Sequence, residues 1–178
     1  MQLAQQDGSE DMSTSTAADT PEEMIENRTF DEISVGDAAR LERTLNAEDI
    51  LLFAAVSGDV NPAHVDAEYA EGTRFHGVVA HGMWGAAMLS ALIGTQLPGP
   101  GTIYLSQSLS FIAPVRIGDT LTASVTVSAK NAEHHHLTLD CRITNQHGRD
   151  VITGTALVLA PQEKVRRPRM KPAQLRLM

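Results

Sequence analysis

The sequence has little of three features that mark common classes of protein: cysteine, basic charge and long apolar runs. Cys141 is the only cysteine among 178 residues, so no disulfide can form within the chain. Its 14 basic residues are outnumbered by 22 acidic ones, and the formal net charge is -8. Because binding to phosphate backbones or anionic lipid needs basic surface, we expect no nucleic-acid or membrane partner.

The longest apolar stretch, residues 83–97, is interrupted by glycine and polar residues. It is also shorter than the roughly 20 residues that a bilayer requires. The first residues lack the basic and then apolar pattern of a secretion signal. Together with the single cysteine, these absences favour a reducing, cytoplasmic setting.

Composition divides the chain into three parts. Residues 1–28 are polar and acidic, and such a segment cannot offset its ordering entropy, so we expect a disordered tail, in which residues 21–27 could make one helical turn. Residues 29–160 carry the apolar periodicity of one folded domain, and their apolar content suffices for a single core. Residues 161–178 are basic and interrupted by proline, which indicates a solvated tail or a linker rather than a nucleic-acid arm.

Apolar periodicity within the domain predicts helices first and strands afterwards. We expect a strand at 38–45, a helix at 47–57 capped by Asn46, one helical turn near 66–70 and a long buried helix at 78–97. Beyond residue 101, four segments alternate with period two. In the first of them, the side chains expected on one face are Ile103, Leu105, Leu109 and Phe111. Such strands predict an α+β fold, in which a curved antiparallel sheet wraps the long helix.

Candidate reactive side chains are concentrated in residues 57–66, which read S-G-D-V-N-P-A-H-V-D. Asp59 and His64 stand five positions apart across a turn that Pro62 stiffens, so their side chains can meet. A carboxylate and an imidazole can hold one water molecule and share its proton. In a purely structural interpretation, Asp59 is a turn residue that bonds to its own backbone, and His64 is a polar neighbour. We expect Asn61 to brace the turn rather than to contact a substrate.

The next segment opens an apolar helix at a glycine, Gly82. The first amides of a helix have no partner within it, and glycine does not obstruct an approaching oxygen. His81 could be catalytic, but we favour a structural role at the helix start. For Ser90 two roles stay open, a bond within its own helix or orientation of Asp59. Three histidines at 134–136 have no cysteine or acid at ligand spacing, so we expect an exposed loop and no metal site.

Four ordered motifs resemble the MaoC-like dehydratase family, and within it the (R)-specific enoyl-CoA hydratases. They are S-G-D-x-N-P-x-H-x-D at 57–66, V-A-H-G-M at 79–83, G-x-Q-L-P-G-x-G-x-I-Y-L at 94–105 and Q-S-L-S-F-x-x-P-V at 107–115. The resemblance covers roughly residues 30–160. It implies a hot-dog fold, a curved antiparallel sheet wrapped around one long central helix, with an additional helical overhang before that helix.

The resemblance also implies a reaction, the reversible hydration of a trans-2-enoyl-CoA to an (R)-3-hydroxyacyl-CoA by a lyase of fatty acid metabolism. The family's catalytic Asp and His correspond to Asp59 and His64, and its oxyanion donor corresponds to the backbone N–H of Gly82. A supporting serine corresponds to Ser90. Family members are homodimers or dimers of dimers. No cofactor is implied, because coenzyme A is part of the substrate.

The acyl-CoA substrate needs an apolar site for its chain. The side chains that we nominate for it are Met83, Leu89 and Ile93. We also expect an apolar flank of Met83, Trp84 and Ala87 to make the carboxylate of Asp59 more basic. Two other functions stay open: a hot-dog acyl-CoA thioesterase that uses the same helix-start amide, and a non-catalytic acyl-CoA-binding module of a larger assembly.

Overall fold

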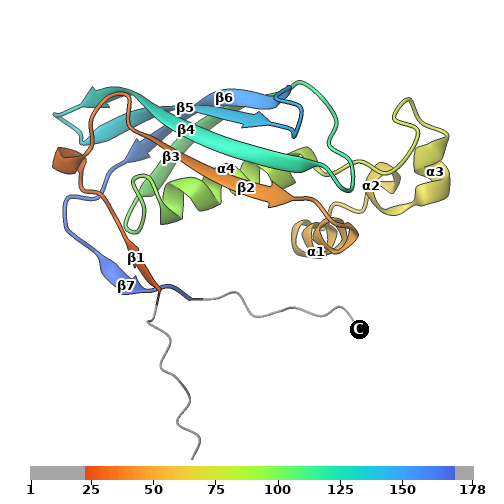
Figure 1. Cartoon of the computed structure of the whole chain (residues 1–178), viewed down its shortest axis with the longest axis horizontal. Helices are drawn as coiled ribbons and strands as arrows, with labels where there is room; N and C mark the ends of the chain where they lie inside the picture. The colour runs from red at the N-terminus through yellow and green to blue at the C-terminus, as the bar shows by residue number, and fades with distance from the viewer. Residues whose placement is uncertain (1–22, 171–178) are drawn as a thin grey trace, which may run out of the picture.

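The computed structural model describes residues 23–170, in which a curved sheet wraps one helix (Figure 1). The sheet has five antiparallel strands in the order β2-β4-β5-β6-β3. These strands are β2 (Ala38–Thr44), β3 (Ile103–Phe111), β4 (Thr120–Asn131), β5 (His136–Thr144) and β6 (Asp150–Leu159). The predicted α+β arrangement of sheet and helix is therefore confirmed. Within the described residues, no helix is long and apolar enough to cross a bilayer.

The central helix is α4 (Gly82–Thr95), which packs into the concave face of the sheet against β4 and β2. Its buried residues are Trp84, Gly85, Met88, Leu89, Leu92 and Ile93. Alternate strand residues meet them from the other side, among them Leu121, Val125, Leu139 and Val158. Gly85 allows the close approach, because a Cβ there would lie 2.5 Å from a methyl carbon of Ile152.

The central helix does not begin at residue 78, as the apolar run predicted, but at Gly82, the glycine at which the motif opens. Residues 78–81 are extended, since Val79 forms an isolated β-bridge with Arg116. The helix begins at Gly82, with His81 as its N-cap residue (φ −58°, ψ 131°). The apolar run is continuous through both parts, so periodicity could not separate an extended segment from a helix.

Three helices form an overhang between β2 and α4 (Figure 1). They are α1 (Ala47–Ser57), α2 (Pro62–Val65) and α3 (Ala67–Glu71). The predicted cap of α1 is confirmed: the Asn46 side chain accepts from the Asp49 amide at 2.8 Å, and the Asp49 carboxylate accepts from the Asn46 amide at 3.1 Å. Asp49 is buried and also pairs with Arg43 of β2, which ties α1 to the sheet. Gly58 ends α1 in the left-handed conformation.

Strand β3 differs from its predicted face pattern. A bulge after Tyr104 shifts the register between β3 and β6. Tyr104 pairs with Val158 and Gln107 pairs with Ala156, and both partners are buried. Since directly paired residues share a face, Tyr104 and Gln107 lie on the concave face. The prediction that Ile103 shares a face with the apolar residues beyond the bulge is therefore wrong.

The two ends of the described chain pair with each other. Strand β1 (Met24–Glu26) runs antiparallel to β7 (Arg166–Pro168), near the loop that follows α4 (Figure 1). We call residues 23–32 and 161–169 the terminal clasp. We expected a disordered tail up to residue 28, with a helical turn possible at 21–27, and a solvated tail or linker after residue 160. Within the clasp, residues 24–26 and 166–168 instead form the paired strands β1 and β7. The rest of both predicted tails lies outside the described residues.

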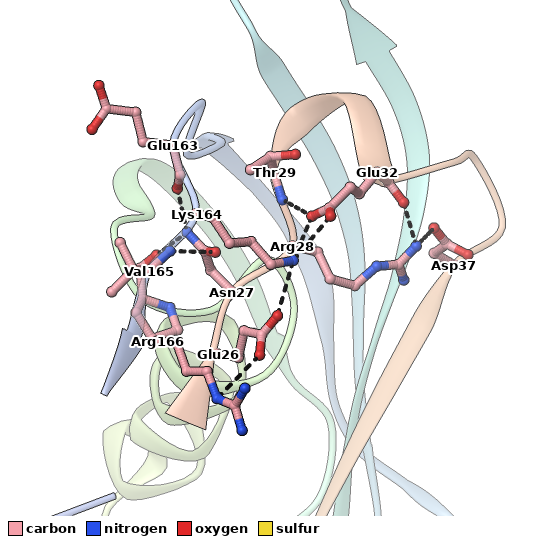
Figure 2. A network of polar contacts seen from close by, with 11 residues as sticks. Glu26, Asn27, Arg28, Thr29, Glu32, Asp37, Glu163, Lys164, Val165 and Arg166 are labelled. Carbon is pink, nitrogen blue, oxygen red and sulfur yellow. Dashed lines mark hydrogen bonds and ion pairs between the residues drawn. The ribbon is translucent and has the colours of Figure 1, made fainter. Parts of the chain in front are cut away.

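Asn27 lies at the centre of the terminal clasp (Figure 2) and is 1% exposed. Its side-chain amide donates to the carbonyls of Pro100 and Glu163, each at 2.9 Å. Its side-chain oxygen accepts from the amide of Val165 at 3.0 Å. Both polar atoms of this buried side chain are therefore paired, and each bond joins segments that lie far apart in the sequence.

Ion pairs surround this buried amide on the outside of the clasp (Figure 2). The ammonium of Lys164 lies 2.7 Å from the carboxylate of Glu32 and 3.3 Å from that of Glu26. Lys164 holds the pKa of Glu32 at about 2, and Glu32 in turn raises the pKa of Lys164. All three side chains are well exposed, so solvent screens these pairs and each contributes little to stability.

Candidate active site

The motif at 57–66 spans a tight turn, residues 58–61, and the short helix α2 that follows it. Pro62 takes the first position of α2, where its missing N–H leaves no bond unmade. The Asn61 side chain accepts from the amide of Ala63 at 3.1 Å and caps α2. The Asn61 amide donates to a carboxylate oxygen of Asp59 at 3.2 Å. Local bonds therefore give this turn its shape and hold the carboxylate at its corner.

The turn brings Asp59 and His64 together, as their spacing predicted. One side-chain ligand atom from each of Asp59, His64 and His81 lies within 4.8 Å of the other two. The Nδ1 of His64 is 2.8 Å from the carbonyl oxygen of Val79. A carbonyl only accepts, so this nitrogen carries the hydrogen, and the neutral ring keeps a free lone pair on Nε2.

His81 lies behind this pair and is 2% exposed. Its Nε2 is 2.9 Å from the backbone carbonyl oxygen of Asp59, so Nε2 carries the hydrogen and donates it. The two imidazole rings of His64 and His81 stack with centroids 4.0 Å apart and planes tilted by 33°. Nδ1 of His81 is buried and has no hydrogen-bond partner among the described residues.

These three side chains also form a possible metal site, the one such group found within residues 23–170. A metal ion must lie close to the ring plane of each histidine ligand, about 2.0 to 2.1 Å from its nitrogen. The lone pairs of two stacked rings run side by side and do not converge on one point. The arrangement therefore suits a water molecule held between Asp59 and His64 better than an ion.

Gly82 presents its backbone N–H beside the two histidines. This N–H is the first of α4, and within residues 23–170 it donates no backbone hydrogen bond. It points along the positive end of the helix dipole, where a developing negative charge is stabilised. The ring of Phe111 packs close by, and a Cβ on Gly82 would lie 2.8 Å from one of its carbons. Glycine therefore keeps the amide accessible beside an aromatic wall.

A cavity of about 500 Å³ opens at His64, His81 and Gly82. Its other walls are mainly apolar and include Met83 of α4 and Phe111 of β3. The polar side chains of its lining are Asn61, His64, Arg74 and His81, and most of the other lining residues are apolar. Such a chamber suits a ligand that joins a polar carbonyl group to an apolar chain.

The other nominated residues lie elsewhere on α4. Met83 lines the cavity, but Leu89 and Ile93 are 0% and 1% exposed and pack in the core. Their helical spacing turns them toward the sheet. Ser90 lies on the exposed face of α4, and within the described residues its hydroxyl forms no hydrogen bond with Asp59. The role of each in binding or catalysis stays a prediction.

Within one chain, the expected apolar flank does not bury the carboxylate of Asp59, which is exposed. Met83 and Trp84 line the cavity of His64, while Trp84 and Ala87 line a second groove of about 570 Å³ between α1, α4 and β2. The same apolar run therefore supplies the walls of two separate hollows. Sequence periodicity alone could not show that Trp84 borders both hollows, whereas Met83 lines one and Ala87 the other.

Sequence reasoning underestimated two residues of the site. Phe111 was assigned to a strand face and not to the wall beside the Gly82 amide. The bond from His81 to Asp59 was not foreseen, although a histidine directly before Gly82 was the available signal. Both contacts join segments more than 20 residues apart, which no local pattern encodes.

Comparison with known proteins gives consistent matches over the domain. The family described as "MaoC like domain" matches residues 32–146. An (R)-specific enoyl-CoA hydratase of Rhodospirillum rubrum is 49% identical over 132 residues, which cover 74% of this chain and 91% of that protein. A protein of the same name from Aeromonas caviae is 45% identical over 129 residues, covering 72% and 96%. The unliganded R-hydratase PhaJ1 from Pseudomonas aeruginosa has a TM-score of 0.83 at 40% identity, covering 88% of this chain and 100% of that one.

Proposed function

This chain belongs to the MaoC-like domain family, and we propose that it hydrates trans-2-enoyl-CoA to (R)-3-hydroxyacyl-CoA in a reversible reaction. One observation carries the proposal: Asp59 meets His64, and His64 lines a mainly apolar cavity together with Gly82, whose N–H is free within the described residues. Two relatives that it matches over most of their length are named for this reaction.

The water molecule is activated between the two side chains. His64 donates its Nδ1–H to Val79, so its free Nε2 can take a proton from water as the water oxygen bonds to C3 of the enoyl group. Asp59 holds the second hydrogen of that water. The proton taken by His64 is then delivered to C2, so the atoms of one water molecule are added across the double bond.

Negative charge that develops on the thioester oxygen is stabilised by Gly82. Its N–H stands at the start of α4 with no backbone acceptor among the described residues. One preorganised donor of this kind is typically worth about 10²- to 10³-fold in rate, or about 3 to 4 kcal/mol. The thioester already acidifies the α position, so this chemistry needs no metal or redox cofactor, and coenzyme A enters as part of the substrate.

We propose that the active form is a homodimer, or a dimer of dimers, joined along β3. Within residues 23–170 no strand pairs with the outer side of β3. Three of its apolar side chains, Ile103, Leu105 and Phe111, are 55%, 44% and 53% exposed. An apolar edge strand invites pairing with another strand, and a second copy would extend the sheet across the interface. The wall that Phe111 forms would then lie close to that interface.

The test is hydration of enoyl-CoA esters of several chain lengths by the wild type and by Asp59→Asn and His64→Ala. We expect loss of the enoyl absorbance with formation of the (R)-alcohol in the wild type. Each variant should lose on the order of 10²- to 10⁴-fold in kcat, because each removes part of the proton transfer. Light scattering should give the same mass for all three proteins.

Two results would contradict this function. Release of free thiol from a saturated acyl-CoA, without hydration, would identify a thioesterase that uses the Gly82 amide. Binding of enoyl-CoA without turnover by the wild type would identify a binding module. Wild-type rates in both variants would instead remove Asp59 and His64 from the mechanism.

A further inference from the structure

The turn that carries Asp59 is held by local bonds with one exception. The Asp59 amide donates to the hydroxyl of Ser57 at 3.2 Å, and the Asp59 carboxylate accepts from Asn61, both within two positions. The exception is the bond from Nε2 of His81 to the Asp59 carbonyl, which spans 22 positions. Among the hydrogen bonds of Asp59, this bond alone ties the residue to the start of α4.

The same imidazole supports the other reacting side chain. The ring of His81 stacks on that of His64 at 4.0 Å, and its centroid lies 5.0 Å from that of Phe53. His64 is hydrogen-bonded to Val79, two positions before His81. His81 is also the residue directly before Gly82 and its free N–H. One buried side chain therefore touches or adjoins all three groups of the site.

A histidine at position 81 is not explained by packing alone, because its Nδ1 is buried without a partner among the described residues. A buried polar atom without a hydrogen bond destabilises the folded state. A phenylalanine would fill a similar space and leave no unpaired nitrogen. What histidine provides and phenylalanine lacks is the Nε2–H that holds the Asp59 carbonyl.

We propose that His81 is a positioning residue for the hydration proposed above. Its Nε2–H sets the place of Asp59 and its ring sets the plane of His64, both relative to the amide of Gly82. The inference rests on the proposed function for its catalytic meaning, while the positioning itself is a structural property that can be measured separately. A displacement of about 1 Å in a reacting group can lower the rate on the order of 100-fold.

Two substitutions distinguish the effect of the stacked ring from the effect of the N–H donor. His81→Phe keeps the aromatic stack and removes the N–H. His81→Gln removes the ring, but its amide nitrogen can reach a similar place and donate to Asp59. Phe53→Leu is the matched control, because it changes the other aromatic contact of His81 and leaves both polar groups in place.

We expect His81→Phe to lower kcat for an enoyl-CoA on the order of 100-fold, with KM within about threefold and a melting temperature equal to or above that of the wild type. We expect the kcat of His81→Gln to be at least about tenfold higher than that of His81→Phe. The kcat of Phe53→Leu should stay within about threefold of the wild-type value. A merely structural histidine would give the opposite order: lower melting temperature and unchanged kcat in the folded fraction. Wild-type kcat in His81→Phe, or equal losses in Phe and Gln variants, would overturn the proposal.

A readout without substrate keeps the two proposals distinguishable. Nitrogen-15 NMR of the His64 ring reports its tautomer and hydrogen bond to Val79. We expect the His64 signals to shift or broaden in His81→Gln, which removes the stacked ring, and to stay near their wild-type positions in Phe53→Leu. Unchanged His64 signals in His81→Gln would overturn the positioning role. A wild type that lacks hydratase activity would contradict the proposed function alone.

Discussion

The two ends of α4 differ in whether the buried or backbone polar groups near them are hydrogen-bonded. At its N-terminal end, the Gly82 amide and one nitrogen of His81 have no hydrogen-bond partner within the described residues. Beyond its C-terminal end, both polar atoms of the buried Asn27 side chain are bonded (Figure 2). Unpaired polar groups weaken a fold but can bind a ligand, whereas paired groups stabilise it and are not free to react. One end of the helix therefore offers polar groups that can bind a ligand, and the other end holds the chain together.

The terminal clasp depends more on its buried amide than on its ion pairs. Each hydrogen bond of Asn27 is worth on the order of 1 kcal/mol, and leaving its partners unpaired costs more. The surrounding pairs of Lys164 are exposed and screened, and such pairs add little. The comparison of the two ends thus predicts a large loss in the free energy of unfolding when Asn27 is replaced. It predicts a smaller loss, in kcat/KM, for Gly82, and a small, pH-dependent change in melting temperature for Glu32.

The largest stability effect is expected for Asn27→Ala. This change removes three side-chain hydrogen bonds and leaves the Val165 amide without its acceptor, so we expect a loss of about 3 kcal/mol in the free energy of unfolding. Denaturant unfolding measures it. The kcat at a temperature where the variant is folded should match the wild type. Glu163→Ala is the control, because only the backbone carbonyl of Glu163 takes part in the network (Figure 2).

A strong decrease of kcat in Asn27→Ala would contradict this comparison, because the clasp would then affect the groups at the N-terminal end of α4. Equal unfolding free energies for Asn27→Ala and Glu163→Ala would show that the buried amide does not hold the clasp.

The next effect is expected for Gly82→Ala. The new methyl group would press on the Phe111 ring and on the approach to the amide, so we expect kcat/KM to fall on the order of 10- to 100-fold, or about 1.4 to 2.7 kcal/mol. Gly94→Ala on the same helix is the control, because a Cβ there has no atom within 4 Å. That control should raise the melting temperature slightly, as alanine favours helix more than glycine does. Equal activity of both variants would speak against the Gly82 amide as the oxyanion donor.

The smallest effect is expected for Glu32→Gln, and it depends on pH. Lys164 lowers the pKa of Glu32 from 4.5 to about 2, so the carboxylate stabilises the fold above pH 4.5 and loses this contribution as the pH falls toward about 2. The raised pKa of Lys164 keeps the pair charged up to its usual value of 10.5 and beyond. The difference in melting temperature between wild type and variant should be small at neutral pH and should vanish at the acidic limit. High salt should also reduce it, and a difference independent of pH would exclude the ion pair as its cause.

Local signals were sufficient where a few neighbouring residues decide the structure. Asn46 and Asp49 cap each other within one turn, so the start of α1 could be predicted to the residue. Gly58 ends the same helix in a conformation that glycine adopts easily. Asp59 and His64 could be paired because only the short turn between them sets their distance.

Long-range contacts explain what the sequence did not predict. The extended conformation of residues 78–81 depends on the bridge between Val79 and Arg116, and the face of Tyr104 depends on a bulge opposite β6. The clasp joins residues near 25 to residues near 167 through backbone pairing and polar side chains. No apolar period marks such a pairing, so a polar segment that finds a partner resembles a tail that has none.

By itself, the sequence determined the hot-dog fold, the acid and imidazole of the turn and the glycine at the helix start, because each depends on periodicity, turn chemistry or motif. The cytoplasmic setting stays a prediction. Only the tertiary structure decided that His81 holds Asp59, that two hollows share one apolar helix and that the chain ends form a clasp. Each of these is a contact between distant segments, and its geometry exists only after the sheet has closed around α4.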